Sequence, residues 1–433
     1  MDEVTGRVWA ALGGSAGEVS YRGAGDVLPA RLPVRDAARA TVGACSLAAA
    51  GLLALRNGGP VPEVVVDEGA VAVAFTSERH LRVDGRAGGA FAPLSGFWRT
   101  ADGWVRTHAN YPHHRERLLS ALGVPDDPDA LARELAARQA LEVQETAYAA
   151  GGLAVAVATA PDPARRPLVE VRRTTGDRRA LPPADRPADG VRVLDLTRVI
   201  AGPVATRVLA FLGADVLRVD SPRLPEDAHA HADTGIGKRS ASLDLDDPAD
   251  LRTLEALLDD ADVVVTGYRP GALDRYGLAP EALLAGRPGL VVAQLSAWGY
   301  AGEWASRRGF DSLVQAATGI AAVEGVDGGP GVLPAQALDH GTGYLLAAAV
   351  LRGLAEPGGR HVRLSLAGTA SWLLHEVRAS APEGDHDPGR WLTTTPSPYG
   401  PLRHALPPVR YAGAPTTWDR GPSLWGSDEP RWR

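Results

Sequence analysis

Apolar and polar positions follow a different pattern in each part of the chain. Beyond Gly190, short runs of consecutive apolar residues alternate with segments of helical periodicity, which predicts strands and helices in turn. The predicted strands lie at 191–196, 214–219, 262–265, 289–293 and 361–366, and the predicted helices at 203–212, 248–259, 281–285 and 343–356. This alternation predicts an α/β fold with a Rossmann-like parallel sheet, whose ligands bind outside the carboxyl ends of the strands.

The first 189 residues have a different texture. A small-residue helix is predicted at 44–56 and a strand at 64–66, and an Asp-Gly turn between apolar residues at 97–105 predicts a hairpin. Helices are expected to follow at 113–122 and 128–151. The hairpin and these helices predict a smaller α+β domain. Residues 161–189 are rich in Pro, Arg and Asp without a sustained period, which is typical of a linker.

A weak internal repeat relates the two parts. Leu32-Pro33, then Arg39 and a helix from Gly43 to Arg56, correspond to Leu333-Pro334, then Asp339 and a helix from Gly343 to Glu356. Each helix leads through Gly-Gly into an apolar strand. Chance similarity between two Ala-rich helices is the alternative explanation. If the repeat is real, Arg39 occupies in the first copy the position that Asp339 has in the second.

These patterns divide the chain into five predicted parts. They are a degenerate large-domain-like segment at 1–90, a small α+β domain at 91–160, a linker at 161–189, a ligand-binding large domain at 190–375, and an irregular tail at 376–433 that packs back on the large domain.

Charge and cysteine content exclude several classes of function. The formal net charge of −7 disfavours a nucleic acid or an anionic membrane as partner, because both need a basic surface. Cys45 is the only cysteine, which excludes an internal disulfide or a Cys-based zinc site. The start of the chain lacks the pattern of a secretory signal, and the apolar run at 42–55 is too short to span a bilayer. We predict a cytoplasmic protein without a metal.

Two nucleotide-binding motifs are absent, although cations follow several predicted strands. Ala232 occupies the first glycine position of a P-loop ending at Gly237-Lys238, and the turn after strand 191–196 lacks the dinucleotide fingerprint. Each cation alone could be a solvated surface charge. Together, on loops at one edge of a sheet, they could bind the phosphates of a ligand. These cations are Arg223, Lys238, Arg239, Arg269 and Arg275.

A series of motifs makes a family resemblance specific. They are Gly190–Thr197, Ala201–Pro203, Leu212–Val219, Gly237–Ser240, Arg269–Gly271 with Arg275–Gly277, Gly309–Asp311 and Asp339 with Gly343. In this order they resemble class III (CaiB/BaiF-type) coenzyme A-transferases, and residues 97–105 are similar to the hairpin in the small domain of that family. The resemblance implies that CoA or acyl-CoA is bound as substrate, with Asp339 as the catalytic nucleophile. The binding residues it implies are Val199, Ile200, Ala201, Arg223, Lys238, Arg239, Tyr268, Arg269, Arg275, Phe310 and Asp311.

The position of Asp339 suits a nucleophile, although an ordinary helix N-cap is the other interpretation. At the start of a helix, free N–H groups and the helix dipole are expected to favour its ionised form. Gly341 and Gly343 are expected to leave room for the substrate and to offer backbone donors. Racemases of the family have a histidine where this chain has Phe310, so racemization is disfavoured. His340 adjoins Asp339 but should point elsewhere along the helix.

The order of the parts departs from the family pattern, because a segment like the small domain precedes the intact start of the large domain. A fusion of two family copies explains this order, and the chain would then be a pseudo-dimeric monomer or a homodimer. We predict a transferase of sulfur-containing groups that moves CoA between small carboxylic acids through an aspartyl-acyl anhydride. The alternatives are an acyl-CoA racemase, isomerase or hydrolase of the same family, and a catalytically impaired CoA-binding protein.

Overall fold

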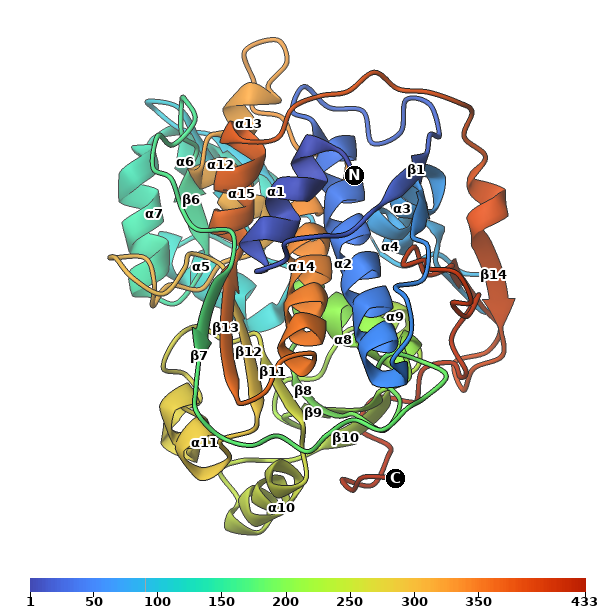
Figure 1. The fold of residues 1–433 in the computed structure, drawn as a ribbon. Helices are drawn as coiled ribbons and strands as arrows, with labels where there is room; N and C mark the ends of the chain where they lie inside the picture. Colours follow the sequence, from blue (N-terminus) through green and yellow to red (C-terminus); the bar gives the residue numbers. More distant parts are fainter. Residues whose placement is uncertain (90) are drawn as a thin grey trace.

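A seven-stranded sheet lies at the centre of the computed structural model, which describes residues 1–89 and 91–433 (Figure 1). Its strands are β7 (Glu170–Arg173), β8 (Arg192–Leu196), β9 (Asp215–Asp220), β10 (Arg239–Ser242), β11 (Val263–Thr266), β12 (Val291–Ser296) and β13 (Arg360–Ser365). Their order in the sheet is β10-β9-β8-β11-β12-β13-β7, and every neighbouring pair is parallel except β13 with β7. The parallel strands therefore follow the doubly wound order 3-2-1-4-5-6, with a crevice expected between β8 and β11. The predicted α/β class is confirmed.

The strands are continuous apolar runs in the sequence because both faces of the sheet are buried. Val263 and Val265 join the core on one face, whereas Val264 between them joins the core on the other. Successive side chains of a strand point to opposite faces, so a strand covered on both sides needs apolar residues at every position. The uninterrupted valines of β11 therefore place it in the middle of the sheet.

Helices cover both faces of the sheet (Figure 1). One face carries two helices and, outside them, a second layer of two more: α8 (Ala201–Phe211), α14 (Ala337–Leu354), α2 (Val34–Asn57) and α1 (Glu3–Ala11). The opposite face carries α10 (Pro248–Asp259) and α11 (Pro280–Gly286). Helix α2 begins ten residues earlier than predicted, because its first turns carry charged residues that hide the apolar pattern. Arg39, for example, is paired with Asp36 and Glu68.

The helix–strand–helix order occurs in both halves of the predicted repeat. Helix α2 is followed by β2 (Val65–Asp67) and α3 (Glu68–Phe75), as α14 is followed by β13 and α15 (Leu366–His375). Strand β2 is parallel to β1 (Ser20–Arg22), as β13 is to β12. Helices α2 and α14 pack against each other, so the first half of the repeat extends the core of the second.

A smaller α+β unit has its own apolar core, as predicted for this region. Its elements are β4 (Phe97–Arg99), β5 (Trp104–Thr107), β6 (Ala154–Ala156), α5 (Pro112–Leu122), α6 (Pro128–Ala136) and α7 (Ala140–Ala149). Strands β4 and β5 form the predicted hairpin around Asp102-Gly103. The helix predicted at 128–151 is broken in two because the Asp102 carboxylate accepts a hydrogen bond from the backbone N–H of Ala140 and so starts α7.

Two regions predicted to be irregular contain short strands. Residues 161–189 include β7, and the tail contributes β14 (Leu392–Thr395) and β15 (Leu402–Ala405), which pair with each other and with β3 (Arg82–Val83). The end of the chain packs on the large sheet, where the backbone N–H of Asp428 donates to the carbonyl of Ser240. The remaining elements are α4 (Ser77–His80), α9 (Ala228–Thr234), η1 (Asp274–Tyr276), α12 (Asp311–Ala317), α13 (Ile320–Val323) and η2 (Pro388–Trp391).

The division into five parts stays a prediction, and its first boundary falls on residue 90, outside the described residues. One apolar core extends from Val4 through the large sheet to Trp418. Helix α2 is long and apolar enough to cross a membrane by length and composition, but 78% of its most apolar window is buried in the protein. Its packing against α14 identifies it as a core helix.

Candidate active site

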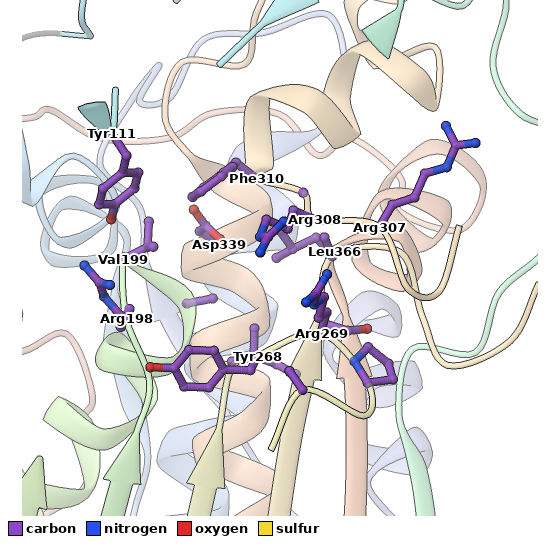
Figure 2. A pocket seen from close by; sticks show the side chains of 18 of the residues that line it. Tyr111, Arg198, Val199, Tyr268, Arg269, Arg307, Arg308, Phe310, Asp339 and Leu366 are labelled. Carbon is purple, nitrogen blue, oxygen red and sulfur yellow. The ribbon is translucent and has the colours of Figure 1, made fainter. Parts of the chain in front are cut away.

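A cavity of about 280 Å³ opens at the carboxyl edge of the large sheet. Its walls come from the segments after β8, β9, β11, β12 and β13, from the 305–310 segment and from residues 111–114 of the smaller unit. This is the position where the strand order reverses and where a doubly wound sheet binds its ligand. Figure 2 shows side chains from these separate segments around one space, with Asp339 among them.

Asp339 lies in the first turn of α14, and its carboxylate lines the cavity. The residue is 6% exposed, so its oxygens are enclosed yet accessible from the cavity. Its backbone N–H donates to the carboxylate of Asp311 at 2.9 Å. Asp311, at the start of α12, also accepts a hydrogen bond from the Gln315 side chain. Asp311 thus satisfies an unpaired donor at the N-terminus of α14 and fixes the helix that carries Asp339.

Burial raises the proton affinity of both neighbouring carboxyl groups, Asp311 and Asp339. Burial raises the pKa of Asp311 to about 6. Burial, and then the negative charge of Asp311, raise the pKa of Asp339 well above its ordinary value. The expectation that the helix N-terminus favours the ionised form is therefore wrong, because loss of water and the second carboxylate outweigh the dipole. Ionisation of Asp339 therefore costs more free energy here than it does for a solvent-exposed aspartate.

Gly341 and Gly343 do not line the cavity. A Cβ at Gly343 would come within 2.6 Å of the Ala201 carbonyl oxygen on α8, and a Cβ at Gly341 would contact Thr41 and Thr369. The prediction that they leave room for the substrate is wrong. The absence of a side chain at Gly343 instead allows α14 to lie close to α8.

Aromatic rings form one wall of the cavity. Phe310 stacks on His108 with the ring centroids 3.7 Å apart, and Tyr111 and His114 lie about its ring at 6.0 Å. The Tyr111 hydroxyl donates a hydrogen bond to Glu226, which also forms an ion pair with Arg198. The wall combines the apolar ring of Phe310 with the polar atoms of Tyr111, His113 and His114, and it places one unit of the fold against the other.

Four arginines line the cavity, and only some of them form an ion pair with a carboxylate of the protein. Arg198 is paired with Glu226, and Arg307 is paired with Glu145 and Glu303. Within residues 1–89 and 91–433, the side chains of Arg269 and Arg308 have no carboxylate partner at salt-bridge distance. After burial, the positive charge of Arg269 is the largest cause lowering the pKa of Arg308, so the two guanidinium groups lie close together. Figure 2 shows both arginines among the side chains that line the cavity with Asp339.

The structure brings together some of the predicted site residues. Besides Asp339, five of the residues implied by the resemblance line the cavity, namely Val199, Ala201, Tyr268, Arg269 and Phe310. Ile200 packs against the core beside it, and Asp311 is buried behind Asp339. Arg223 and Arg275 both contact Asp246 at the same edge of the sheet, outside the cavity lining. They are exposed and lie one and three residues from Leu224 and Ala272 of the cavity wall.

Lys238 and Arg239 lie away from the cavity, and their predicted position on a loop at the carboxyl edge is corrected. Arg239 begins β10, so it lies at the amino edge of the sheet, where it forms a two-pronged pair with Asp215. The Lys238 ammonium is fully buried and contacts Asp195 at 3.0 Å, Thr206 and the Pro203 carbonyl. Both residues were misplaced because β10 has a largely polar sequence and was therefore not predicted as a strand.

The sequence analysis missed Arg198, Arg308, Tyr111 and His114 as cavity residues. Arg198 follows the strand at 191–196, so the rule that ligands bind at carboxyl ends could have identified it. Arg308 and His114 carry no comparable signal, because the tertiary fold brings their segments to the sheet edge.

Val199 has a backbone conformation that β-branched residues rarely adopt. Its φ is +71°, in the left-handed region, and it lies in the turn between β8 and α8 that borders the cavity. This backbone conformation costs about 1–3 kcal/mol, and it persists only where the surrounding structure enforces it. The strain lies at the point where the strand order reverses, which is the expected ligand position.

No group of three or more His, Cys, Asp or Glu side chains suited to a metal ion occurs in the part of the chain that the structure describes.

The fold and the cavity define an α/β protein with a carboxylate and free arginines at its switch point. The sequence pattern of CoA-transferase family III matches residues 188–411, and the chain belongs to this family.

Individual relatives match a smaller share of the chain. It is 36% identical over 183 residues to the probable fatty acyl-CoA transferase Rv3272 of Mycobacterium tuberculosis, covering 39% of this chain and 46% of the relative. It is 30% identical over 225 residues to the succinyl-CoA:glutarate CoA-transferase of Mus musculus, covering 48% and 52%. The chain thus spans about half the length of these relatives. A crystal structure of Rv3272 superposes with a TM-score of 0.41 at 34% identity, over 43% of this chain and 56% of that one.

Proposed function

We propose that the chain is a CoA-transferase that binds an acyl-CoA in the cavity and carries out transfer through Asp339. The observation that carries the proposal is the combination of one accessible, enclosed carboxylate with two unpaired arginines in the same cavity. CoA offers a thioester for the carboxylate and phosphates for the guanidinium groups. Arg223 and Arg275 at the same sheet edge are further phosphate ligands in this proposal, because their exposed ion pairs with Asp246 are weak.

The proposed reaction needs no net proton transfer. An Asp339 oxygen attacks the thioester carbonyl, the C–S bond breaks, and CoA leaves as thiolate to give a mixed anhydride. The thiolate then attacks the Asp339 carbonyl carbon, so that the donor acid leaves as carboxylate and CoA is held on Asp339. The acceptor carboxylate attacks this thioester, and the released thiolate attacks the acceptor's acyl carbon. Asp339 is regenerated as carboxylate, and CoA has moved between two acids.

Replacing the two unpaired arginines tests the proposed orientation of CoA. We expect Arg269→Gln and Arg308→Gln each to weaken CoA binding about tenfold, because a charge-assisted hydrogen bond contributes about 1.5–3 kcal/mol. The double variant should lose about 100-fold, measured by calorimetry at one ionic strength. Arg252→Gln on α10 makes the same change in net charge on the other face of the sheet and should have no effect.

Pantetheine supplies a matched ligand control, because it lacks the phosphates. Its affinity should be the same for the double variant as for the wild type. A double variant that binds CoA as tightly as the wild type would refute this orientation of the ligand.

The Asp311–Asp339 pair predicts a pH dependence. Only ionised Asp339 can attack, and its pKa is raised, so kcat/KM for acyl-CoA should rise with pH through that raised pKa. Asp311→Asn removes the neighbouring negative charge, which lowers the pKa of Asp339. The acidic limb of the pH profile should therefore move to lower pH in the variant. An unchanged limb would show that Asp339 titration does not control the rate.

The isomerase alternative differs in an observable product. Exchange of the α-proton of the acyl group with solvent, without transfer to an acceptor acid, would favour it. The geometry supports transfer instead, because Phe310 occupies the position of the family's second base and carries no group that accepts a proton.

A further inference from the structure

His114 is a buried imidazole whose hydrogen-bonding capacity is unused. It lies in the first turn of α5, is 4% exposed and lines the same cavity as Asp339. Neither of its ring nitrogens has a hydrogen-bond partner in residues 1–89 or 91–433. Burying a polar group without a partner is costly, and such a group on the wall of a cavity is a candidate contact for a ligand.

The neighbours of His114 cannot supply the missing partner. The rings of Tyr111 and Phe310 meet it edge-on, with centroids 5.8 and 6.0 Å away. The Tyr111 hydroxyl is already bonded to Glu226. The adjacent His113 ring is tilted against it at 4.1 Å without a hydrogen bond between them. The unused nitrogens therefore remain available to a molecule in the cavity.

The electric field at His114 favours an anionic ligand group. Burial is the main cause that lowers the pKa of His114 to about 3, and among the charged groups that add to it, Arg308 and Arg117 are cations at physiological pH. The imidazole is therefore neutral at physiological pH, with one N–H donor and one acceptor nitrogen. A neutral donor in a positive field binds a carboxylate oxygen better than it binds an apolar group.

We propose that His114 recognises a second carboxylate on the acyl group, so that the substrates are thioesters of short dicarboxylic acids. The inference rests on the proposed function for the placement of the thioester carbonyl at Asp339. Phe310 connects the two positions: its ring is in T-shaped contact with His114, and the carboxylate of the next residue, Asp311, accepts a hydrogen bond from the backbone N–H of Asp339. In this proposal the acyl chain lies along the Phe310 ring, between the reacting carbonyl and the distal carboxylate.

Binding of matched thioesters tests the proposal without requiring turnover. On an Asp339→Asn background, which prevents transfer, succinyl-CoA and butyryl-CoA are compared by calorimetry. The two ligands differ at the end of the acyl chain, where one has a carboxylate and the other a methyl group. We expect succinyl-CoA to bind about tenfold more tightly or better, as for a hydrogen bond to a charged group. His114→Phe should abolish this difference by weakening succinyl-CoA binding alone.

His114→Gln serves as the conservative variant, because it keeps a neutral donor and should retain part of the preference. Thermal melting of each variant checks that it is folded. Absence of any preference for succinyl-CoA in the His114-intact protein would overturn the proposal, as would a preference that survives in His114→Phe. Loss of the preference in His114→Phe supports it even if Asp339 proves not to be acylated, so the two proposals fail separately.

Discussion

Asp339→Asn should lose acyl transfer by at least about 10³-fold while keeping its affinity for CoA within about threefold. The amide cannot attack a thioester, but it has nearly the shape of the carboxylate, so the cavity and its arginines stay in place. Initial rates of CoA exchange between two acids, with CoA affinity from calorimetry, check both parts. Substantial transfer by the variant would show that Asp339 is not the nucleophile.

The same variant should be more stable than the wild type at neutral pH. The pKa of Asp339 is raised in the folded protein, so the folded state binds more protons than the unfolded state between the ordinary and the raised pKa. Stability falls as pH rises through that window, and the neutral amide avoids the loss. We expect the Tm of Asp339→Asn to exceed that of the wild type by about 1–3 °C at pH 8, with a smaller excess at pH 5.

Lys238→Met should destabilise the protein by about 3–5 kcal/mol without a direct effect on CoA binding. The Lys238 ammonium is the cation beside the fully buried carboxylate of Asp195, and its loss leaves that carboxylate unpaired. Urea unfolding measures the change. Arg252→Gln, at an exposed position, is the control for losing one positive charge.

A second substitution separates the structural role of Lys238 from a ligand role. Adding Asp195→Asn to Lys238→Met removes the orphaned charge and should restore much of the stability. The role implied by the family resemblance, that Lys238 binds CoA, predicts a different result. CoA affinity would then fall tenfold or more at unchanged stability, and the structural assignment would be refuted.

The fold was predictable because its strongest signals are local. Uninterrupted apolar strands such as Val263–Val265 identify a sheet buried on both faces, and their alternation with helices fixes the class. Strand β10 escaped detection because Arg239-Ser240-Ala241-Ser242 has no apolar run. Helix α2 was predicted too short because its first turns are charged.

The candidate site was only partly predictable, because it combines residues distant in sequence. Asp339, Arg269 and Phe310 belong to sequence motifs, and they meet in the cavity. Arg308 and His114 belong to none, and their segments reach the cavity only through tertiary packing. The direction of the pKa shift of Asp339 could not be predicted from the sequence either, because it depends on burial and on the position of Asp311 beside it.

Trapping of the acylated carboxylate is the most direct test of the account. The purified chain is incubated with an acyl-CoA, succinyl-CoA first, and then with hydroxylamine, which converts an aspartyl anhydride or thioester to a hydroxamate. Peptide mass spectrometry should place the hydroxamate on Asp339, and its yield should depend on the thioester. An unmodified Asp339 in protein that turns over the thioester, or a hydroxamate on another carboxylate, would contradict the central claim.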